Sequence, residues 1–303
     1  MNDREQIPPV DYRCGYVALV GRPNVGKSSL LNRMVGQKIS ITSPKPQTTH
    51  WALYGIRTEP DYQAIFVDTP GLQNRHRDSI NRHLTRETRS AIAQVDVLVF
   101  MTEAMSWYAG DAQVLDMLGK TEAPIVCVIN KIDRVPDRDR LLPFIQQVSA
   151  AAKFEAIIPV SALRNENIET LQATIAKLLP VAPPVYPVDQ LSNRDERFFA
   201  AEFIREKLVR VLGQELPYRI AVTIERIQRQ PKITKIDAVI WVEGESQKRI
   251  IVGKNGAVLK AVGEKARKDL EAMFGVRLFL RTWVKIRKNW TDNAKAMKEF
   301  GYV

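Results

Sequence analysis

Cysteine, histidine and long apolar runs are all scarce in this chain. Two cysteines, Cys14 and Cys127, and three histidines occur among 303 residues. Two cysteines cannot build the disulfide framework of a small secreted domain, so we expect free thiols in a reducing compartment. The longest nearly apolar runs, such as Val95–Met101, are too short to cross a bilayer. The first ten residues are polar and contain two prolines, unlike a signal peptide. We therefore expect a cytoplasmic protein.

Positive charge is concentrated in the C-terminal part. Residues 191–303 carry 24 Lys and Arg against 14 Asp and Glu, a net charge of +10. Residues 1–190 carry 21 against 20. Because basic regions attract polyanions, this asymmetry predicts that the C-terminal part meets either nucleic acid or an anionic membrane surface.

Apolar runs alternate with helical patterns through the first 180 residues. Strands are expected at Tyr16–Val20, Ala52–Arg57, Tyr62–Val67, Val95–Met101, Ile125–Ile129 and Ile157–Val160. Helices are expected at Ser29–Val35, Ser79–Gln94, Asp111–Gly119, Asp139–Ala152 and Ile168–Leu179. This alternation predicts a doubly wound α/β sheet, and its most apolar strands should be covered by helices on both faces.

Four prolines between residues 179 and 187 interrupt the alternation. Proline cannot continue a helix, so we expect an extended, semi-stiff linker here. The predicted organisation is a flexible lead-in over 1–14, a first domain over 15–181, a proline-rich linker over 182–190 and a second domain over 191–303.

The second domain has the pattern of a smaller α+β fold. A charged helix is expected at Arg197–Leu212. Strands are expected at Ile220–Arg226, Ile233–Val242 and Val276–Val284. Between the second and third strands, two helical segments, Ser246–Val252 and Ala257–Phe274, flank the tetrapeptide G-K-N-G. Gly275 should end the second of these helices.

The strongest local signal is G-R-P-N-V-G-K-S at residues 21–28, between an apolar strand and a helix. Glycines let successive backbone N–H groups converge on a phosphate, and the helix start adds partial positive charge. Lys27 can reach the outer phosphates, and the Ser28 hydroxyl can ligate magnesium. The full pattern in this context favours a phosphate site over a simple glycine turn.

Three further motifs follow strands, which should bring them to the same sheet edge. In D-T-P-G, Asp68 can hold magnesium through water and the Gly71 N–H can meet a terminal phosphate. In N-K-I-D, Asp133 can accept hydrogen bonds from two guanine donors that adenine lacks, so this motif favours GTP over ATP. In S-A-L, backbone N–H groups can meet the guanine oxygen.

The four motifs in this order resemble the translation-factor-related branch of P-loop GTPases. The resemblance implies a magnesium-binding threonine in the polar segment 38–50, with Thr49 as first choice and Thr48 as second. Family members often carry Arg after this pair, where this chain has His50. The segment is also suited to an order–disorder switch.

Two positions bear on hydrolysis. Leu72 stands where many signalling GTPases carry a water-orienting glutamine, and leucine cannot make that hydrogen bond. We therefore predict slow intrinsic hydrolysis, or hydrolysis completed by another group. Related GTPases with a similar phosphate loop use an asparagine matching Asn24 to help hold potassium. A simple turn residue is the alternative role for Asn24.

The motifs and the resemblance together predict the nucleotide site. The nucleotide-binding residues are Gly21, Arg22, Pro23, Asn24, Val25, Gly26, Lys27, Ser28, Ser29, Asp68, Thr69, Pro70, Gly71, Leu72, Asn130, Lys131, Asp133, Ser161, Ala162 and Leu163. The magnesium ligands are Ser28, Thr49 and Asp68. The catalytic residues are Lys27, Thr49 and Gly71. The expected cofactors are GTP or GDP and Mg²⁺, with K⁺ as the further candidate.

The G-K-N-G tetrapeptide between two helices resembles a KH module of type II. Such a loop approaches the backbone of single-stranded nucleic acid and holds about four nucleotides. The predicted RNA-binding residues are Ile251, Val252, Gly253, Lys254, Asn255, Gly256 and Lys260. For any single further basic residue a solvated surface position is the more expected role, and the further candidate phosphate contacts are Lys265, Arg267, Lys268, Arg281, Lys285, Arg287 and Lys288. Packing is the more expected role of Trp241, Trp283 and Trp290.

Residues 14–290 as a whole resemble the bacterial Era GTPases, with close matches at Leu216–Tyr218, Gln247–Gly253 and Trp283–Lys285. The resemblance implies a cytoplasmic GTPase that binds the 3′ end of small-subunit (16S) rRNA and assists 30S maturation, and we expect a monomer. Peripheral contact with the inner membrane is a further expectation. Two alternatives remain open: a GTP-dependent RNA-binding scaffold with little turnover, and a membrane-surface adaptor GTPase.

Overall fold

The computed structural model describes residues 9–42, 53–68, 94–119, 121–212 and 220–300. They form two compact units. The first unit holds the described residues up to Ser40 and those from 53 to Asn193. The second holds Ile41, Thr42 and the described residues from Arg194 onward.

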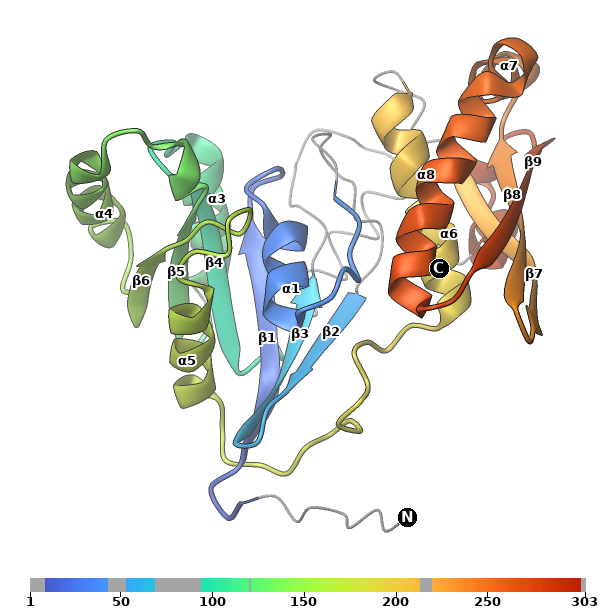
Figure 1. The fold of residues 1–303 in the computed structure, drawn as a ribbon. Helices are drawn as coiled ribbons and strands as arrows, with labels where there is room; N and C mark the ends of the chain where they lie inside the picture. Colours follow the sequence, from blue (N-terminus) through green and yellow to red (C-terminus); the bar gives the residue numbers. More distant parts are fainter. Residues whose placement is uncertain (1–8, 43–52, 69–93, 120, 213–219, 301–303) are drawn as a thin grey trace. The chain divides into compact units, whose positions relative to one another are not determined.

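The first unit is built on a six-stranded sheet with the strand order β2-β3-β1-β4-β5-β6 (Figure 1). The strands are β1 (Arg13–Gly21), β2 (Leu53–Thr58), β3 (Tyr62–Asp68), β4 (Val97–Glu103), β5 (Ile125–Asn130) and β6 (Ala156–Pro159). The helices are α1 (Lys27–Val35), α3 (Ala109–Leu118), α4 (Leu141–Ser149) and α5 (Ile168–Leu178). All neighbouring strands are parallel except the antiparallel pair β2 and β3. The predicted doubly wound α/β fold is confirmed.

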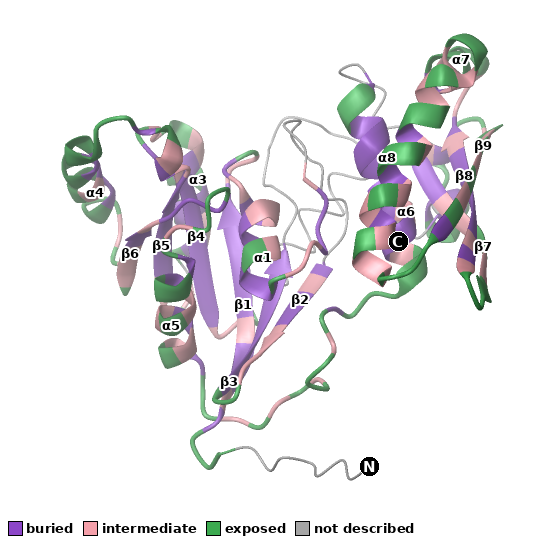
Figure 2. Ribbon diagram, in the orientation of Figure 1, coloured by how far each residue is buried: buried purple, intermediate pink, exposed green. Residues whose placement is uncertain are grey.

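The central strands carry the core of this unit. Figure 2 shows β1, β4 and β5 largely in the colour of buried residues. Phe100 and Cys127 belong to one cluster with Val114 of α3 and Phe144 of α4, so these helices cover one face of the sheet. Burial raises the pKa of the Cys127 thiol to about 12, with a smaller contribution from Asp111. Cys127 therefore behaves as a small apolar side chain.

Several predicted boundaries in this unit differ from the structure by up to three residues, and two of these differences have a clear physical reason. The first strand begins at Arg13 rather than Tyr16, because it continues its parallel pairing with β3 back to Tyr62. The fourth helix begins at Leu141 rather than at residue 139, after a 3₁₀ turn over 138–140. Pro143 then lies in the first helical turn, where its missing N–H leaves no helical hydrogen bond unmade. The helix expected at 79–94 lies outside the described residues except for its last position.

The proline-rich stretch is held against the first unit by Gln63, a fully buried side chain of β3. Its Oε1 atom accepts hydrogen bonds from the backbone N–H groups of Val185, at 2.8 Å, and Tyr186, at 2.9 Å. Its Nε2 atom donates to the Tyr186 carbonyl oxygen at 2.8 Å. This part of the expected linker is thus fixed by specific hydrogen bonds.

The second unit is a smaller α+β fold, as predicted. Its sheet has the order β7-β8-β9, in which β7 and β8 are antiparallel and β8 and β9 are parallel. The strands are β7 (Ala221–Gln230), β8 (Ile233–Val242) and β9 (Leu278–Ile286). The helices are α6 (Glu196–Val211), α7 (Glu245–Val252), α8 (Ala257–Phe274) and α9 (Ala294–Glu299). One sheet face packs Ala238 and Ile240 against Ile204 of α6 and Val262 of α8.

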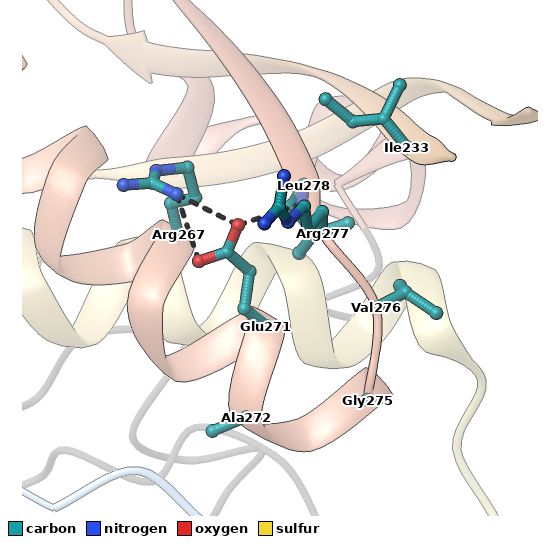
Figure 3. A pocket seen from close by; sticks show the side chains of 8 residues that line it. All are labelled: Ile233, Arg267, Glu271, Ala272, Gly275, Val276, Arg277 and Leu278. Atoms are coloured by element: carbon teal, nitrogen blue, oxygen red, sulfur yellow. Dashed lines mark hydrogen bonds and ion pairs between the residues drawn. The ribbon is translucent and has the colours of Figure 1, made fainter.

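The turn from α8 into β9 surrounds a shallow hollow of about 760 Å³ (Figure 3). Gly275 ends α8 in the left-handed conformation, with φ 67°, as predicted. The Glu271 carboxylate accepts hydrogen bonds from the Leu278 N–H at 2.9 Å and from Arg267 at 2.8 and 2.9 Å. The turn occupies residues 275–277, so β9 begins at Leu278 rather than at the predicted position 276.

Candidate functional site

The phosphate loop connects β1 to α1 and needs glycine at residue 26. Gly26 adopts φ 106°, which side-chain-bearing residues rarely do. A Cβ atom at this position would lie 2.3 Å from Nδ2 of Asn130. Asn24 is also left-handed, with φ 63°, and asparagine is one of the few residue types that tolerate this conformation. The loop backbone is therefore held in a tight, left-handed path before the helix.

Lys27 is buried within this loop. Its ammonium group donates hydrogen bonds to the carbonyl oxygens of Gly21 and Arg22, both at 2.9 Å. Burial lowers the pKa of Lys27 to about 8, Asp68 opposes that change and Arg22 adds to it. The ammonium is thus already oriented by the loop that is predicted to hold the phosphates.

Three oxygen-bearing side chains converge beside the phosphate loop. The hydroxyls of Ser28 and Ser40 both donate to Oδ2 of Asp68, at 3.1 and 2.9 Å. Asp68 is fully buried at the end of β3. Oxygen donors are what Mg²⁺ prefers, so the group fits the predicted ion. Ser40 was missed by sequence reasoning, because a lone serine in a polar segment carries no signal.

Hydrogen bonds tie the N-K-I-D motif, which is predicted to bind guanine, to the phosphate loop and to the S-A-L loop. Asn130 at the end of β5 donates to the Val25 carbonyl oxygen at 2.8 Å, and its Oδ1 atom accepts from the Ala162 N–H at 3.1 Å. Ser161 donates to Oδ1 of Asp133 at 2.5 Å. Asn130 therefore ties the phosphate loop to the S-A-L loop, and Ser161 fixes the rotamer of the carboxylate.

Two further side chains that the motifs do not name support this arrangement. Arg33 of α1 donates to the carbonyl oxygens of Ala162 and Leu163, at 2.8 and 2.9 Å. Glu103 of β4 pairs with Lys131 at 2.5 Å. No sequence motif marks Arg33 or Glu103, and their roles become visible only when the fold brings them next to the S-A-L and N-K-I-D loops.

Some predicted site residues lie outside the described parts of the chain. They are Thr48, Thr49, His50, Thr69, Pro70, Gly71 and Leu72. The described members of the nucleotide site, in contrast, are gathered at the carboxyl ends of β1, β3, β5 and the loop after β6. This is where open α/β sheets bind ligands.

The segment predicted as a switch begins with residues that are firmly bonded. In the first unit, Oδ1 of Asn32 accepts from the backbone N–H groups of Ile39 and Ser40, both at 2.8 Å. In the second unit, the N–H and hydroxyl of Thr42 donate to the buried carboxylate of Glu206, at 3.1 and 3.2 Å. The chain therefore passes from one unit to the other at Ser40 and Ile41.

The G-K-N-G loop joins α7 to α8 in a conformation that requires its glycines (Figure 1). Gly253 has φ 72°, and a Cβ there would lie 2.5 Å from Cγ2 of Val258. Asn255 and Gly256 are both left-handed, with φ 52° and 76°. The resulting loop is compact, and Lys254 projects from it as an exposed cation.

The predicted RNA-binding residues divide into exposed and buried groups. Lys254, Asn255 and Lys260 are exposed, whereas Ile251 is completely buried in the core of the unit. Ile251 therefore supports the loop from beneath. The three tryptophans also differ: Trp290 is fully buried, but Trp283 is 41% exposed.

Several of the basic candidates are engaged in ion pairs. Arg267 pairs with Glu271, Arg281 with Asp237, Lys285 with Glu225 and Arg287 with Glu299. Lys260, Lys265, Lys268 and Lys288 are exposed. Among the described residues, none of the helices is long and apolar enough to span a membrane.

Comparison with known families matches each half of the chain. A family model described as a 50S ribosome-binding GTPase matches residues 16–131, and a KH domain model matches residues 215–291. GTPase Era of Coxiella burnetii (strain Dugway 5J108-111) is 48% identical over 95% of this chain and 98% of its own length. GTPase Era of Marinobacter nauticus is 46% identical over 99% of both chains.

Solved structures agree over nearly the whole chain. A single-residue variant of Aquifex aeolicus Era bound to GDP and AlF₄⁻ gives a TM-score of 0.91 at 35% identity, over 96% of this chain and 99% of that one. Era in complex with MgGDPNP and nucleotides 1506–1542 of 16S ribosomal RNA also gives 0.91, at 36% identity and the same coverage. The predicted resemblance is confirmed: this chain belongs to the Era family of GTPases.

Proposed function

We propose that this GTPase binds the 3′ end of 16S rRNA through its KH domain and uses GTP hydrolysis as a switch during 30S subunit maturation. The observation that carries the proposal is the exposed, glycine-shaped loop at 253–256, which presents Lys254 and Asn255 to solvent. A related Era structure holds nucleotides 1506–1542 of 16S ribosomal RNA, which supports the choice of RNA.

The nucleotide roles follow from the described geometry. Asp133, fixed by Ser161, accepts hydrogen bonds from guanine, and Asn130 keeps the two flanking loops together. Lys27 moves from the loop carbonyls to the outer phosphates and neutralises charge there. The Gly71 N–H meets the terminal phosphate, so it reports whether that phosphate is present.

Ser28 would hold magnesium directly, Asp68 would hold it through water, and Thr49 would supply the ligand from the switch segment. The oxygen donors already gathered around Asp68 support this assignment. When bound, Mg²⁺ would supply positive charge that neutralises the outer phosphates. The Ser40 hydroxyl holds the Asp68 carboxylate in position through its hydrogen bond.

Switching is proposed to act through the segments 38–50 and 68–78. Their order depends on the terminal phosphate, and they bias the KH domain between two poses. The hydrogen bonds of Ser40 in one unit and of Thr42 in the other support this assignment, because they fix the first residues of the switch segment to both units. We further propose functional domains over 15–181 and 191–303, a monomer, and a cytoplasmic location with peripheral contact at the inner membrane.

RNA binding of the wild type and two charge-matched variants tests the proposal. The ligand is an oligonucleotide matching the single-stranded 3′ end of 16S rRNA, with a scrambled oligonucleotide as control, at fixed low salt. Lys254→Asp should weaken binding of the matched RNA by about tenfold or more, because a phosphate contact becomes a repulsion. Lys298→Asp makes the same charge change at an exposed position of α9 and should have little effect. Equal loss in both variants would reject a specific role for the loop.

A further inference from the structure

The outward face of the second unit's sheet presents aromatic and basic side chains in alternation. Residues of β9 alternate in burial, and on its outward face Phe279 is 47% and Trp283 41% exposed. Arg281 and Lys285 occupy the remaining outward positions and are about half exposed. Because a strand rises about 3.3 Å per residue, the two aromatic side chains are separated by about 13 Å, with Arg281 between them.

The central cation of this face is fixed in orientation. Arg281 lies opposite Asp237 of β8 and donates two hydrogen bonds to its carboxylate, each of 2.8 Å. The guanidinium carbon lies 5.3 Å from the centre of the Trp283 ring, within range of a cation–π interaction. Two planar groups are therefore already placed next to each other on an exposed surface.

The rest of the face is partly covered by the chain itself. Phe300 stacks on Trp241, with ring centres 5.2 Å apart, and Trp290 packs against Phe300. Packing against Phe300 therefore explains why Trp290 is buried and Trp241 half-buried. Neither of these two contacts involves Trp283, whose ring stays exposed.

The charge of this face favours a polyanion. Cations on it come from all three strands: Arg226 of β7, Lys235 of β8, and Arg281 and Lys285 of β9. The anions opposing them are Asp237 and Glu225, each already paired with one of those cations. Aromatic rings that alternate with cations bind single-stranded nucleic acid, because each base can stack on a ring while phosphates meet the charges.

We propose that this outward face, centred on Phe279, Arg281 and Trp283, is a second binding surface for single-stranded RNA, separate from the G-K-N-G loop. The inference rests on the proposed RNA-binding function of the loop and extends it. Within the described sheet β9 is an edge strand, so no other strand lies between its free edge and solvent. An RNA strand held at the loop can continue over this edge onto the outward face.

Oligonucleotides of two lengths distinguish binding at the G-K-N-G loop from binding at the outward face. One oligonucleotide of about four nucleotides matches the span of a KH loop, and another of about twelve nucleotides is long enough for both surfaces. Fluorescence anisotropy at fixed salt measures both affinities for the full chain. The test variant is Phe279→Ala combined with Trp283→Ala. The control is Leu142→Ala, which removes an exposed apolar side chain, 63% accessible, from α4 of the first unit.

We expect the double variant to bind the longer RNA about a hundredfold more weakly and the shorter RNA normally, since each of the two lost stacks costs about tenfold. Trp283→Phe should retain most of the affinity. Lys235→Glu, which leaves both rings in place, should also weaken only the longer RNA. Lys254→Asp should weaken both RNAs, and thermal unfolding by circular dichroism verifies that each variant is folded.

Unchanged affinity for the longer RNA in both the double variant and Lys235→Glu would overturn the second surface. Loss of small-subunit binding with both RNA affinities unchanged would also overturn it and assign the face to a ribosomal protein. Equal weakening of the two RNAs by the double variant would mean that the rings only support the loop. A wild type that binds neither RNA would reject the proposed function of the loop as well.

Discussion

The two proposed sites of this molecule differ in how far their candidate functional groups are buried. In the nucleotide site, Lys27, Asp68 and Ser161 are buried and each is oriented by hydrogen bonds to the fold. In the RNA-binding unit, Lys254, Asn255 and Trp283 project into solvent. The first site therefore relies on fixed partners in a dry environment, and the second on charge and stacking area spread over a surface.

This difference predicts how each site responds to substitution. Removing one partner in a buried site leaves a polar group unpaired, which is costly. Removing one contact from a wide, exposed surface leaves the others in place, so its effects should be graded. Single substitutions should thus nearly abolish nucleotide recognition but only weaken RNA binding.

The largest expected effect comes from Asp133→Asn. The new side chain has an NH₂ group in place of one carboxylate oxygen, and this group would face a guanine N–H group that needs an acceptor. GTP affinity should therefore fall by at least about a hundredfold. Isothermal titration with GTP measures this loss. Asp139→Asn makes the same change at an exposed position nearby and should be neutral. A loss of less than about threefold in Asp133→Asn would place guanine recognition elsewhere.

The two glycine loops offer the same substitution at both sites. Gly26→Ala brings a Cβ atom to 2.3 Å from Asn130, and Gly253→Ala brings one to 2.5 Å from Val258. We expect Gly26→Ala to lose GTP affinity by about tenfold or more with RNA binding intact, and Gly253→Ala to show the reverse, because each strains one loop. Anisotropy with labelled GTP and labelled RNA measures both affinities.

Gly263 provides the control for this pair. It lies within α8, and a Cβ atom there would meet nothing within 4 Å. Gly263→Ala should therefore stabilise the protein by about 0.5–1 kcal/mol and leave both ligands unaffected. If Gly26→Ala and Gly253→Ala both weakened both ligands equally, the two loops would not each bind their own ligand.

A smaller effect is expected from the choice of monovalent cation. If Asn24 helps hold potassium near the phosphates, GTP turnover should be about tenfold faster in potassium than in sodium salts at equal ionic strength. Asn24→Ala should remove the difference between the salts. Equal wild-type rates in the two salts would leave Asn24 with its left-handed turn role only.

The smallest effect tests a supporting contact of the RNA-binding unit. The Leu278 N–H and then Arg267 hold the pKa of Glu271 below its usual value (Figure 3). This carboxylate therefore stabilises the fold above pH about 4.3, and that stability is lost as the pH falls through its folded pKa. Glu271→Gln should cost about 1 kcal/mol at neutral pH.

Urea unfolding followed by tryptophan fluorescence checks this prediction. The stability difference between Glu271→Gln and the wild type should shrink as the pH falls below 4, because the wild-type carboxylate becomes neutral too. Glu264→Gln on the exposed side of α8 is the matched control. A difference that stays constant down to low pH would show that the charge of Glu271 is not involved.

The nucleotide site was only partly predictable from the sequence. Short motifs predicted Lys27, Ser28 and Asn130 because phosphate and guanine chemistry needs those groups at fixed spacings after strands. Ser40 and Arg33 could not be found in this way. Their roles arise from tertiary neighbours, Asp68 and the carbonyl oxygens of the S-A-L loop, which are distant in sequence.

The RNA-binding unit was predictable as a fold but less so as a surface. The alternation of apolar and polar residues predicted the strands, and the G-K-N-G tetrapeptide predicted the loop. Which tryptophan is buried depends on the register between β8 and β9 and on the packing of α9. Trp283 and Trp290 have similar surroundings in sequence, yet only Trp290 lies under the C-terminal helix.

The most direct test of the account is GTP hydrolysis with no RNA, with an oligonucleotide matching the single-stranded 3′ end of 16S rRNA, and with a scrambled oligonucleotide. The account predicts stimulation by the matched RNA alone, since binding at the KH domain must bias the switch segments if the two sites are coupled. Equal rates under all three conditions at RNA saturation would contradict that coupling.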